Sequence, residues 1–133
     1  MSIFDALNTS ASALTAERLR MDVIASNLAN ADSTRTANGK AYRREMVVFE
    51  ARPPKPGEIG GGVEVAKIVQ DPSPLRMVYD PGNPDANAKG FVAYPNVNPV
   101  IEMTDMLSAT RSYEANVTVM QSIKNAANKA LEI

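Results

Sequence analysis

The placement of proline and glycine constrains the fold of this chain more than any other feature. All nine prolines lie between Pro53 and Pro99, and all seven glycines lie between Gly39 and Gly90. Because both residue types disfavour helix interiors, long helices are expected only at the two ends. The sequence therefore predicts an N-terminal helical segment over residues 1–32, an insert over 33–98 and a C-terminal helical segment over 99–133.

The N-terminal segment predicts a helix over about residues 3–31. Ser2 can cap this helix, with Asp5 three residues later in the position of the capping-box acid. Apolar residues recur at heptad spacing, interrupted at Ser10 and Glu17, which is typical of a long helix that packs on another. The apolar residues expected to form an assembly seam on this helix are Ile3, Leu7, Leu14, Met21, Ile24 and Leu28.

The C-terminal segment predicts a second helix over about residues 100–131. Asn98 is a suitable N-cap, and Pro99 suits the first helical position. Apolar residues follow at alternating spacings of three and four, which indicates a second packing stripe. The residues expected to form the assembly seam on this helix are Met103, Met106, Tyr113, Val117, Met120 and Leu131.

The insert predicts short strands separated by turns. The strands are expected at residues 42–49, 63–69, 75–79 and 90–94, and the turns between them are rich in Pro, Gly, Asp and Asn. The expected fold class is therefore α+β, in which two long terminal helices pair as an α-helical coiled-coil domain and a small, loop-rich β unit is inserted between them.

The composition of the helices bears on what they contact. Each would be roughly 45 Å long, and two such helices cannot surround a core by themselves. Residues 1–31 carry only five charged side chains, and most other positions are Ala, Ser, Thr or Asn. Solvated helices normally display more charge, so several faces are expected to meet other protein molecules. A self-contained hairpin packed on the β unit remains the alternative.

The residue types that are absent exclude much chemistry. The chain has no Cys and no His, so disulfides, thiolate metal sites and the commonest general base are missing. The net charge of −1 gives no long-range attraction to nucleic acid. We expect no catalytic residue, no cofactor and no metal ligand. No stretch approaches the roughly 20 apolar residues of a membrane span, and no cleaved secretory signal is expected.

Three local patterns have ordinary structural interpretations. The triple glycine at 60–62 precedes valine-rich sequence, which favours a flexible turn over a phosphate loop. The acidic segment 80–85 contains two prolines and lacks EF-hand spacing, so it predicts a stiff turn. Arg43 and Arg44 form a compact basic pair, which we interpret as a solvated strand end.

The end of the first helix carries a family resemblance. Residues 26–34, with the sequence SNLANADST, resemble the asparagine-rich motif that closes the first helix of bacterial flagellar rod and hook proteins. Further segments at 41–49, 79–84, 90–97 and 112–116 are similar to the proximal rod branch of that family. Where many relatives have Gly and an aromatic after the motif, Arg35 and Thr36 stand here, which argues against the distal rod and hook branches. The motif residues are Asn27, Leu28, Ala29, Asn30 and Thr34.

The resemblance implies a structural role. Such subunits are exported unfolded by the flagellar type III export apparatus without a cleaved signal, and they assemble in the periplasm into the rod of the basal body. It implies that the terminal helices form an inner coiled-coil layer around the channel, with the β unit outside. The implied partners are copies of the chain, other rod proteins, the adaptor at the rod base and the next rod segment.

Two other functions are alternatives to this one. A cytoplasmic helical hairpin, such as an export chaperone or adaptor, would also fit two long helices. An enzyme acting on the cell wall would fit the need of a rod to cross it, but no spacing of acidic residues singles out a catalytic pair.

Overall fold

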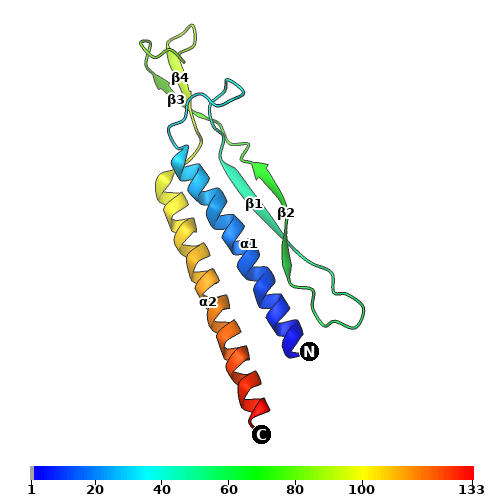
Figure 1. Cartoon of the computed structure of the whole chain (residues 1–133). Helices are drawn as coiled ribbons and strands as arrows, with labels where there is room; N and C mark the ends of the chain where they lie inside the picture. The colour runs from blue at the N-terminus through cyan, green and yellow to red at the C-terminus, as the bar shows by residue number, and fades with distance from the viewer. Residues whose placement is uncertain (1) are drawn as a thin grey trace.

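A computed structural model describes residues 2–133 and confirms the α+β fold class (Figure 1). Two long antiparallel helices lie side by side, a long hairpin runs along the first helix, and a second small sheet stands at one end of the molecule. The elements in chain order are α1 (Ile3–Ala29), β1 (Glu45–Ala51), β2 (Val63–Gln70), β3 (Arg76–Tyr79), β4 (Phe91–Tyr94) and α2 (Pro99–Leu131).

The helix α1 begins at the predicted capping box. The Asp5 backbone N–H donates to Ser2 Oγ over 3.1 Å, and the Ser2 N–H donates to Asp5 Oδ2 over 3.0 Å. The helix ends at Ala29, two residues earlier than expected. Asn30 stops it because the Asn30 side-chain amide turns back to the Ser26 carbonyl, which stabilises a non-helical exit.

The helix α2 begins as its sequence predicts. The Asn98 side chain accepts hydrogen bonds from the N–H groups of Val100 and Ile101, at 3.0 and 3.4 Å, and Pro99 occupies the first helical position. The cap satisfies donors that have no partner within the helix.

The β unit forms two antiparallel pairs rather than one sheet. β1 pairs with β2, with a register shift between Val48 and Phe49, and β3 pairs with β4. β1 begins at Glu45, three residues later than predicted. The residues before it are used elsewhere: the Tyr42 N–H donates to the Ser33 carbonyl, and the Arg44 N–H donates to Asn96 Oδ1.

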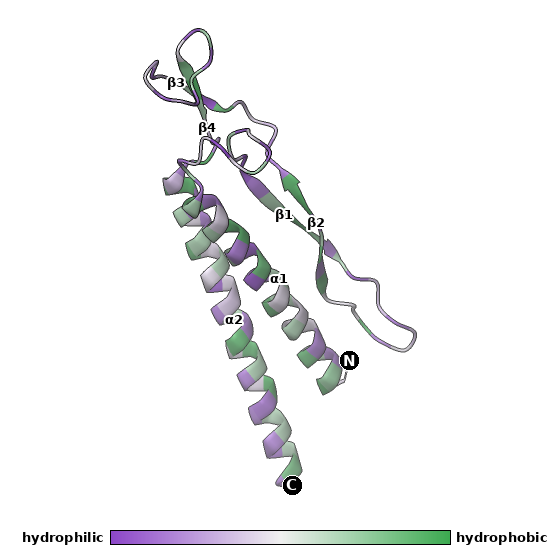
Figure 2. Cartoon of the chain, turned by 45° about the horizontal axis from the view of Figure 1, so that its top comes forward, coloured by the Kyte–Doolittle hydropathy of each residue, from purple (hydrophilic) through white to green (hydrophobic). Residues whose placement is uncertain are grey.

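The helix α1 is the middle layer of the molecule. α2 packs on one side of it and the β1–β2 hairpin on the other, and among the elements in residues 2–133 α2 packs on α1 alone (Figure 1). Figure 2 shows hydrophobic residues spread along α2 to its C-terminal end. The helix α2 is therefore covered on one side only. The buried apolar residues are Ala16, Val23, Ile24, Val92, Val97 and Ala109.

The triple glycine is a docking point as well as a turn. Gly62 has φ +82°, and a Cβ atom there would lie 2.3 Å from Ser12 Oγ in α1. The Val63 N–H next to it donates to Ser12 Oγ over 3.0 Å. Glycine is therefore required both by the backbone angle and by the close approach of the hairpin to the helix.

No helix within residues 2–133 is both long enough and apolar enough to cross a membrane.

Candidate assembly site

The side chain of Asn27 joins three segments of the chain. Asn27 is 1% exposed, and its Oδ1 accepts hydrogen bonds from the Tyr42 hydroxyl at 2.7 Å and from the Glu45 N–H at 3.0 Å. Its Nδ2 donates to the Glu45 carbonyl at 2.9 Å and to Glu102 Oε2 at 3.1 Å. All four hydrogen-bonding positions of the amide are filled, so Asn27 fixes β1 and α2 to the end of α1.

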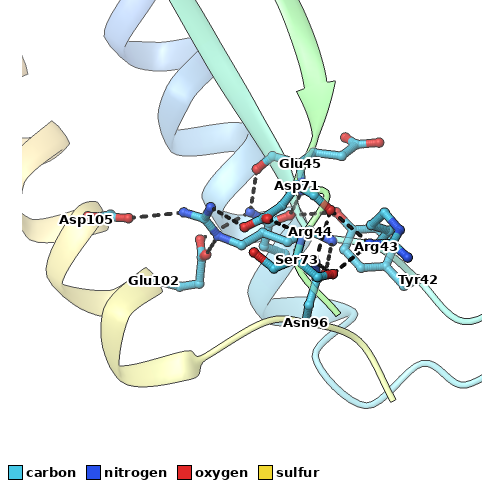
Figure 3. A network of polar contacts seen from close by, with 10 residues as sticks. Tyr42, Arg43, Arg44, Glu45, Asp71, Ser73, Asn96, Glu102 and Asp105 are labelled. Atoms are coloured by element: carbon cyan, nitrogen blue, oxygen red, sulfur yellow. Dashed lines mark hydrogen bonds and ion pairs between the residues drawn. The ribbon is translucent and has the colours of Figure 1, made fainter. Parts of the chain in front are cut away.

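Arg44 is the cation at the centre of this region (Figure 3). Its Nε donates to Glu102 Oε1, its Nη1 lies 3.2 Å from Asp71 Oδ2, and its Nη2 lies 3.5 Å from Asp105 Oδ2. The Glu102 side chain is fully buried, whereas that of Arg44 is 19% exposed. A buried carboxylate needs a cationic partner. The ion pair with Arg44 therefore allows Glu102, in the first turn of α2, to be buried.

The surroundings shift the pKa values of three of these groups. Burial acts to lower the pKa of Arg44, but hydrogen bonding and charge from Glu102 and then Asp71 hold it above its ordinary value. Burial is also the main cause that raises the pKa of the Tyr42 phenol, to which the charges of Glu45 and Glu102 add. Arg44 therefore stays charged and Tyr42 stays neutral over the physiological range.

The loop after β2 is held to the same region. The Asp71 carboxylate accepts hydrogen bonds from Ser73, which lower its pKa, and Arg44 lowers the pKa further. Arg43 Nη1 and Asn96 Nδ2 both donate to the carbonyls of Asp71 and Ser73, at 2.8–3.1 Å (Figure 3). The small β3–β4 sheet is thereby connected to the longer hairpin. We call the set Asn27, Tyr42, Arg44, Asp71 and Glu102 the junction.

The interpretation of Arg43 and Arg44 as a solvated strand end was wrong. Both guanidinium groups bond to other segments of the chain, and Arg44 is mostly buried. The partners come from residues 71–105, so neighbouring sequence gave no sign of them. One signal was available: Glu102 is four residues before Met106, on a face that also carries Tyr113. An acid on an apolar stripe requires a buried cation.

The other residues of the family motif close the end of α1. Asn30 Oδ1 accepts from the Ser33 hydroxyl at 3.1 Å, and the Thr34 hydroxyl donates to Asp85 Oδ2 at 2.8 Å. Leu28 is half-buried and Ala29 is exposed. The motif thus connects α1 to the long loop between β3 and β4.

The residues proposed as the N-helix seam differ in exposure. Ile24 is 5% exposed and Ile3 is 42% exposed. Ile3 and Leu7 line an apolar groove of about 350 Å³ at the free end of the helix pair, together with Met120 from α2. The seam residues with intermediate exposure are Leu7, Leu14, Met21 and Leu28.

The residues proposed as the C-helix seam also fall into two groups. Met103 is 61% exposed and Leu131 is 85% exposed, so neither is covered within the chain. The other four have intermediate exposure on the stripe that packs on α1, and they are Met106, Tyr113, Val117 and Met120. The buried centre of that stripe is formed by Glu102 and Ala109.

Comparison with known proteins identifies the family. A family described as "Flagella basal body rod protein" matches residues 7–35, and one described as "Flagellar basal body rod FlgEFG protein C-terminal" matches residues 88–133. The flagellar basal-body rod protein FlgC of Bacillus subtilis is 51% identical, with 100% of this chain and 99% of that protein covered. The chain belongs to the FlgC family. The FlgC proteins of Escherichia coli O157:H7 and Salmonella typhimurium are 45% and 43% identical, each with 98% of its length covered.

Membership of the FlgC family decides the class of protein. The chain is a structural protein of the flagellar basal-body rod, and it is not an enzyme. It assembles with other components of the basal body. The junction agrees with a structural role, because its buried side-chain polar atoms are bonded to other parts of the same chain.

Proposed function

We propose that this chain is a subunit of the proximal rod, where α1 and α2 form one coiled-coil domain in the inner wall around the export channel and residues 33–98 lie outside. Exposed apolar side chains on α2 are the observation that carries this proposal. Val100 is 71% exposed, Met103 61% and Leu107 51%. Apolar residues in a row on one helix face mark a surface that another protein covers.

The junction supports a role in torque transmission. Asn27 in α1 and Arg44, next to β1, each donate a hydrogen bond to the buried carboxylate of Glu102 in α2, and the bond from Arg44 is also an ion pair. Such contacts resist sliding of the β unit relative to the helices, because displacement would leave buried polar groups without partners. Rotation of the inner helices is thereby passed to the outer part of the subunit.

The route and the neighbours are part of the same proposal. Family membership supports export through the flagellar type III apparatus without a cleaved signal peptide, and assembly in the periplasm. It also supports contacts with copies of the chain, with other proximal rod proteins and the rod-base adaptor, and with the next rod segment. Nothing in the relatives' names favours the alternative of a cytoplasmic chaperone or adaptor.

The substitution Leu107→Asp tests the proposal in a bacterium whose own copy of the gene is deleted. Leu107 is 51% exposed, so the isolated variant should unfold at about the same urea concentration as the original chain. We expect its incorporation into isolated basal bodies, and swimming, to fall at least about tenfold, because the variant would place a charge where the proposed assembly buries an apolar side chain.

The matched control is Ile59→Asp, which changes a residue of similar exposure, 62%, in the loop between β1 and β2. This variant should assemble and swim. Normal swimming of the Leu107→Asp strain would show that the outer face of α2 is not an assembly surface.

A further inference from the structure

The helix α1 has an exposed stripe that faces neither α2 nor the hairpin. Arg18, Asp22, Ala25 and Ala29 recur at spacings of four, three and four, and all are exposed. This places them on one face of the helix. Two charged residues near the middle of the helix are thus followed by two small residues near its C-terminal end.

The helix α2 has a corresponding exposed stripe of opposite character. Met103, Leu107, Arg111 and Glu114 recur at spacings of four, four and three, and all are exposed. Two large apolar residues near the start of the helix are followed by two charged residues. Arg18, Asp22, Arg111 and Glu114 form no ion pair within residues 2–133.

The contacts between α1 and α2 within one molecule show which residues of the two helices lie at the same height. Asn27 bonds to Glu102, and Leu7 and Met120 line one groove near the other end. If a second molecule lay alongside at the same height, its α2 would place Arg111 opposite Arg18. Like charges at that position disfavour an unshifted arrangement.

A small axial shift changes this arrangement. Moving the neighbour's α2 by three to four residues, about 5 Å at about 1.5 Å per residue, brings oppositely charged residues together. The four pairs that then face each other are Asp22 with Arg111, Arg18 with Glu114, Ala25 with Leu107, and Ala29 with Met103. A further turn of shift would place Asp22 opposite Glu114, which is again a like-charge pair.

We propose that the outer face of α2 in one molecule docks antiparallel on the exposed stripe of α1 in a second copy of this chain, in the register that pairs Asp22 with Arg111. Both charged pairs are satisfied in this register, and large side chains fill the space beside small ones. The contact is heterologous, so it continues from copy to copy. This inference rests on the proposed function, since it specifies one contact of the assembled rod.

Charge exchange tests the register. Asp22→Arg and Arg111→Asp should each lower the amount of the chain in isolated basal bodies by about threefold or more, because each creates a like-charge pair. The double variant should restore the amount, because it recreates the pair with the charges exchanged. All these side chains are exposed, so the urea unfolding of the isolated variants should match that of the original chain.

Disulfide formation tests the same register in assembled basal bodies. The chain has no cysteine, so in the variant Ala25→Cys/Leu107→Cys the introduced thiols are the only ones it contributes. Mild oxidation should link copies into dimers and longer products. The control Ala25→Cys/Glu114→Cys places the thiols about 10 Å out of register and should stay monomeric, because a disulfide needs Cα atoms within about 7 Å.

The outcomes separate this inference from the proposed function. If the double charge variant assembles no better than the single variants, or if the control pair links and the test pair does not, the proposed register is wrong. Cross-linking of the test variant only to a different rod protein would overturn the choice of a second copy. Absence of the unaltered chain from basal bodies would instead contradict the proposed function.

Discussion

The junction and the free end of the helix pair are stabilised in different ways. At the junction, Glu102 and Asn27 are buried, and their polar atoms bond to other segments of the chain. At the free end, which we call the foot (residues 3–8 of α1 and 120–131 of α2), Phe4 is 75% exposed and Leu131 is 85% exposed. At the junction the buried polar groups find their partners within the chain, whereas the foot exposes apolar side chains to solvent.

This difference indicates how the subunit divides its tasks. Buried polar contacts have strict geometry and define one arrangement of the helices and the β unit. Apolar surface is less directional and gains free energy with any partner that excludes water from it. A subunit that must be rigid inside and adhesive outside needs both, at separate places.

The largest expected effect is the removal of the cation at the junction. Arg44→Ala leaves the Glu102 carboxylate buried without a counter-charge, and we expect the free energy of unfolding to fall by about 3 kcal/mol or more. Urea denaturation followed by circular dichroism would measure it.

The matched control is Arg35→Ala. Arg35 pairs with Asp85 at 2.8 Å, but its side chain is 67% exposed, so the expected loss is below about 1 kcal/mol. Equal losses of unfolding free energy in the two variants would show that the buried ion pair of Arg44 contributes no more stability than the exposed pair of Arg35.

A smaller effect at the junction is expected in acid. The pKa of Asp71 is lowered from its ordinary value of 3.8 by hydrogen bonds from Ser73 and then by Arg44. A carboxyl whose pKa is lowered by folding stabilises the fold above the unfolded value, and this contribution is lost as pH falls through the folded pKa. Below about pH 4, the unfolding free energy of the original chain should therefore decrease more steeply than that of Asp71→Asn. If the unfolding free energy fell equally with pH in both proteins, the Asp71 carboxylate would not stabilise the junction.

The smallest effect is expected at the foot. Phe4→Ser and Leu131→Ser change exposed side chains, and the unfolding free energy of the isolated chain should change by no more than about 0.5 kcal/mol. Incorporation into basal bodies should nevertheless fall, because these residues lose apolar contact with neighbours. A large loss of stability in the isolated chain would show that the foot belongs to the folded core.

The sequence predicted the helices and their caps because these depend on local features. The capping box of Ser2 and Asp5, the cap at Asn98 and the exclusion of proline from both ends act within a few residues. All four strands were placed to within about three residues for the same reason, because turn residues mark their ends.

The junction was not predictable from the same signals. Asn27 was identified only as part of a motif, and its partners lie 15, 18 and 75 residues away in the chain. The sequence places Arg44 at a strand end, where charged side chains are usually solvated, so it predicts a surface residue and not a buried one. The close approach of Gly62 to Ser12 was not predictable either, because the sequence of a glycine-rich segment does not indicate whether it packs against a helix.

The bond between Asn27 and Glu102 has a consequence for the order of events in folding. Its two residues are separated by 75 positions, so the core of the junction stays incomplete until the first turn of α2 is available. Contacts between distant parts of a chain form late, because a long loop must close before they gain anything. A nascent chain that still lacks Glu102 therefore holds Asn27 and Arg44 without their shared partner, and we expect it to unfold readily until the last quarter of the sequence has been made.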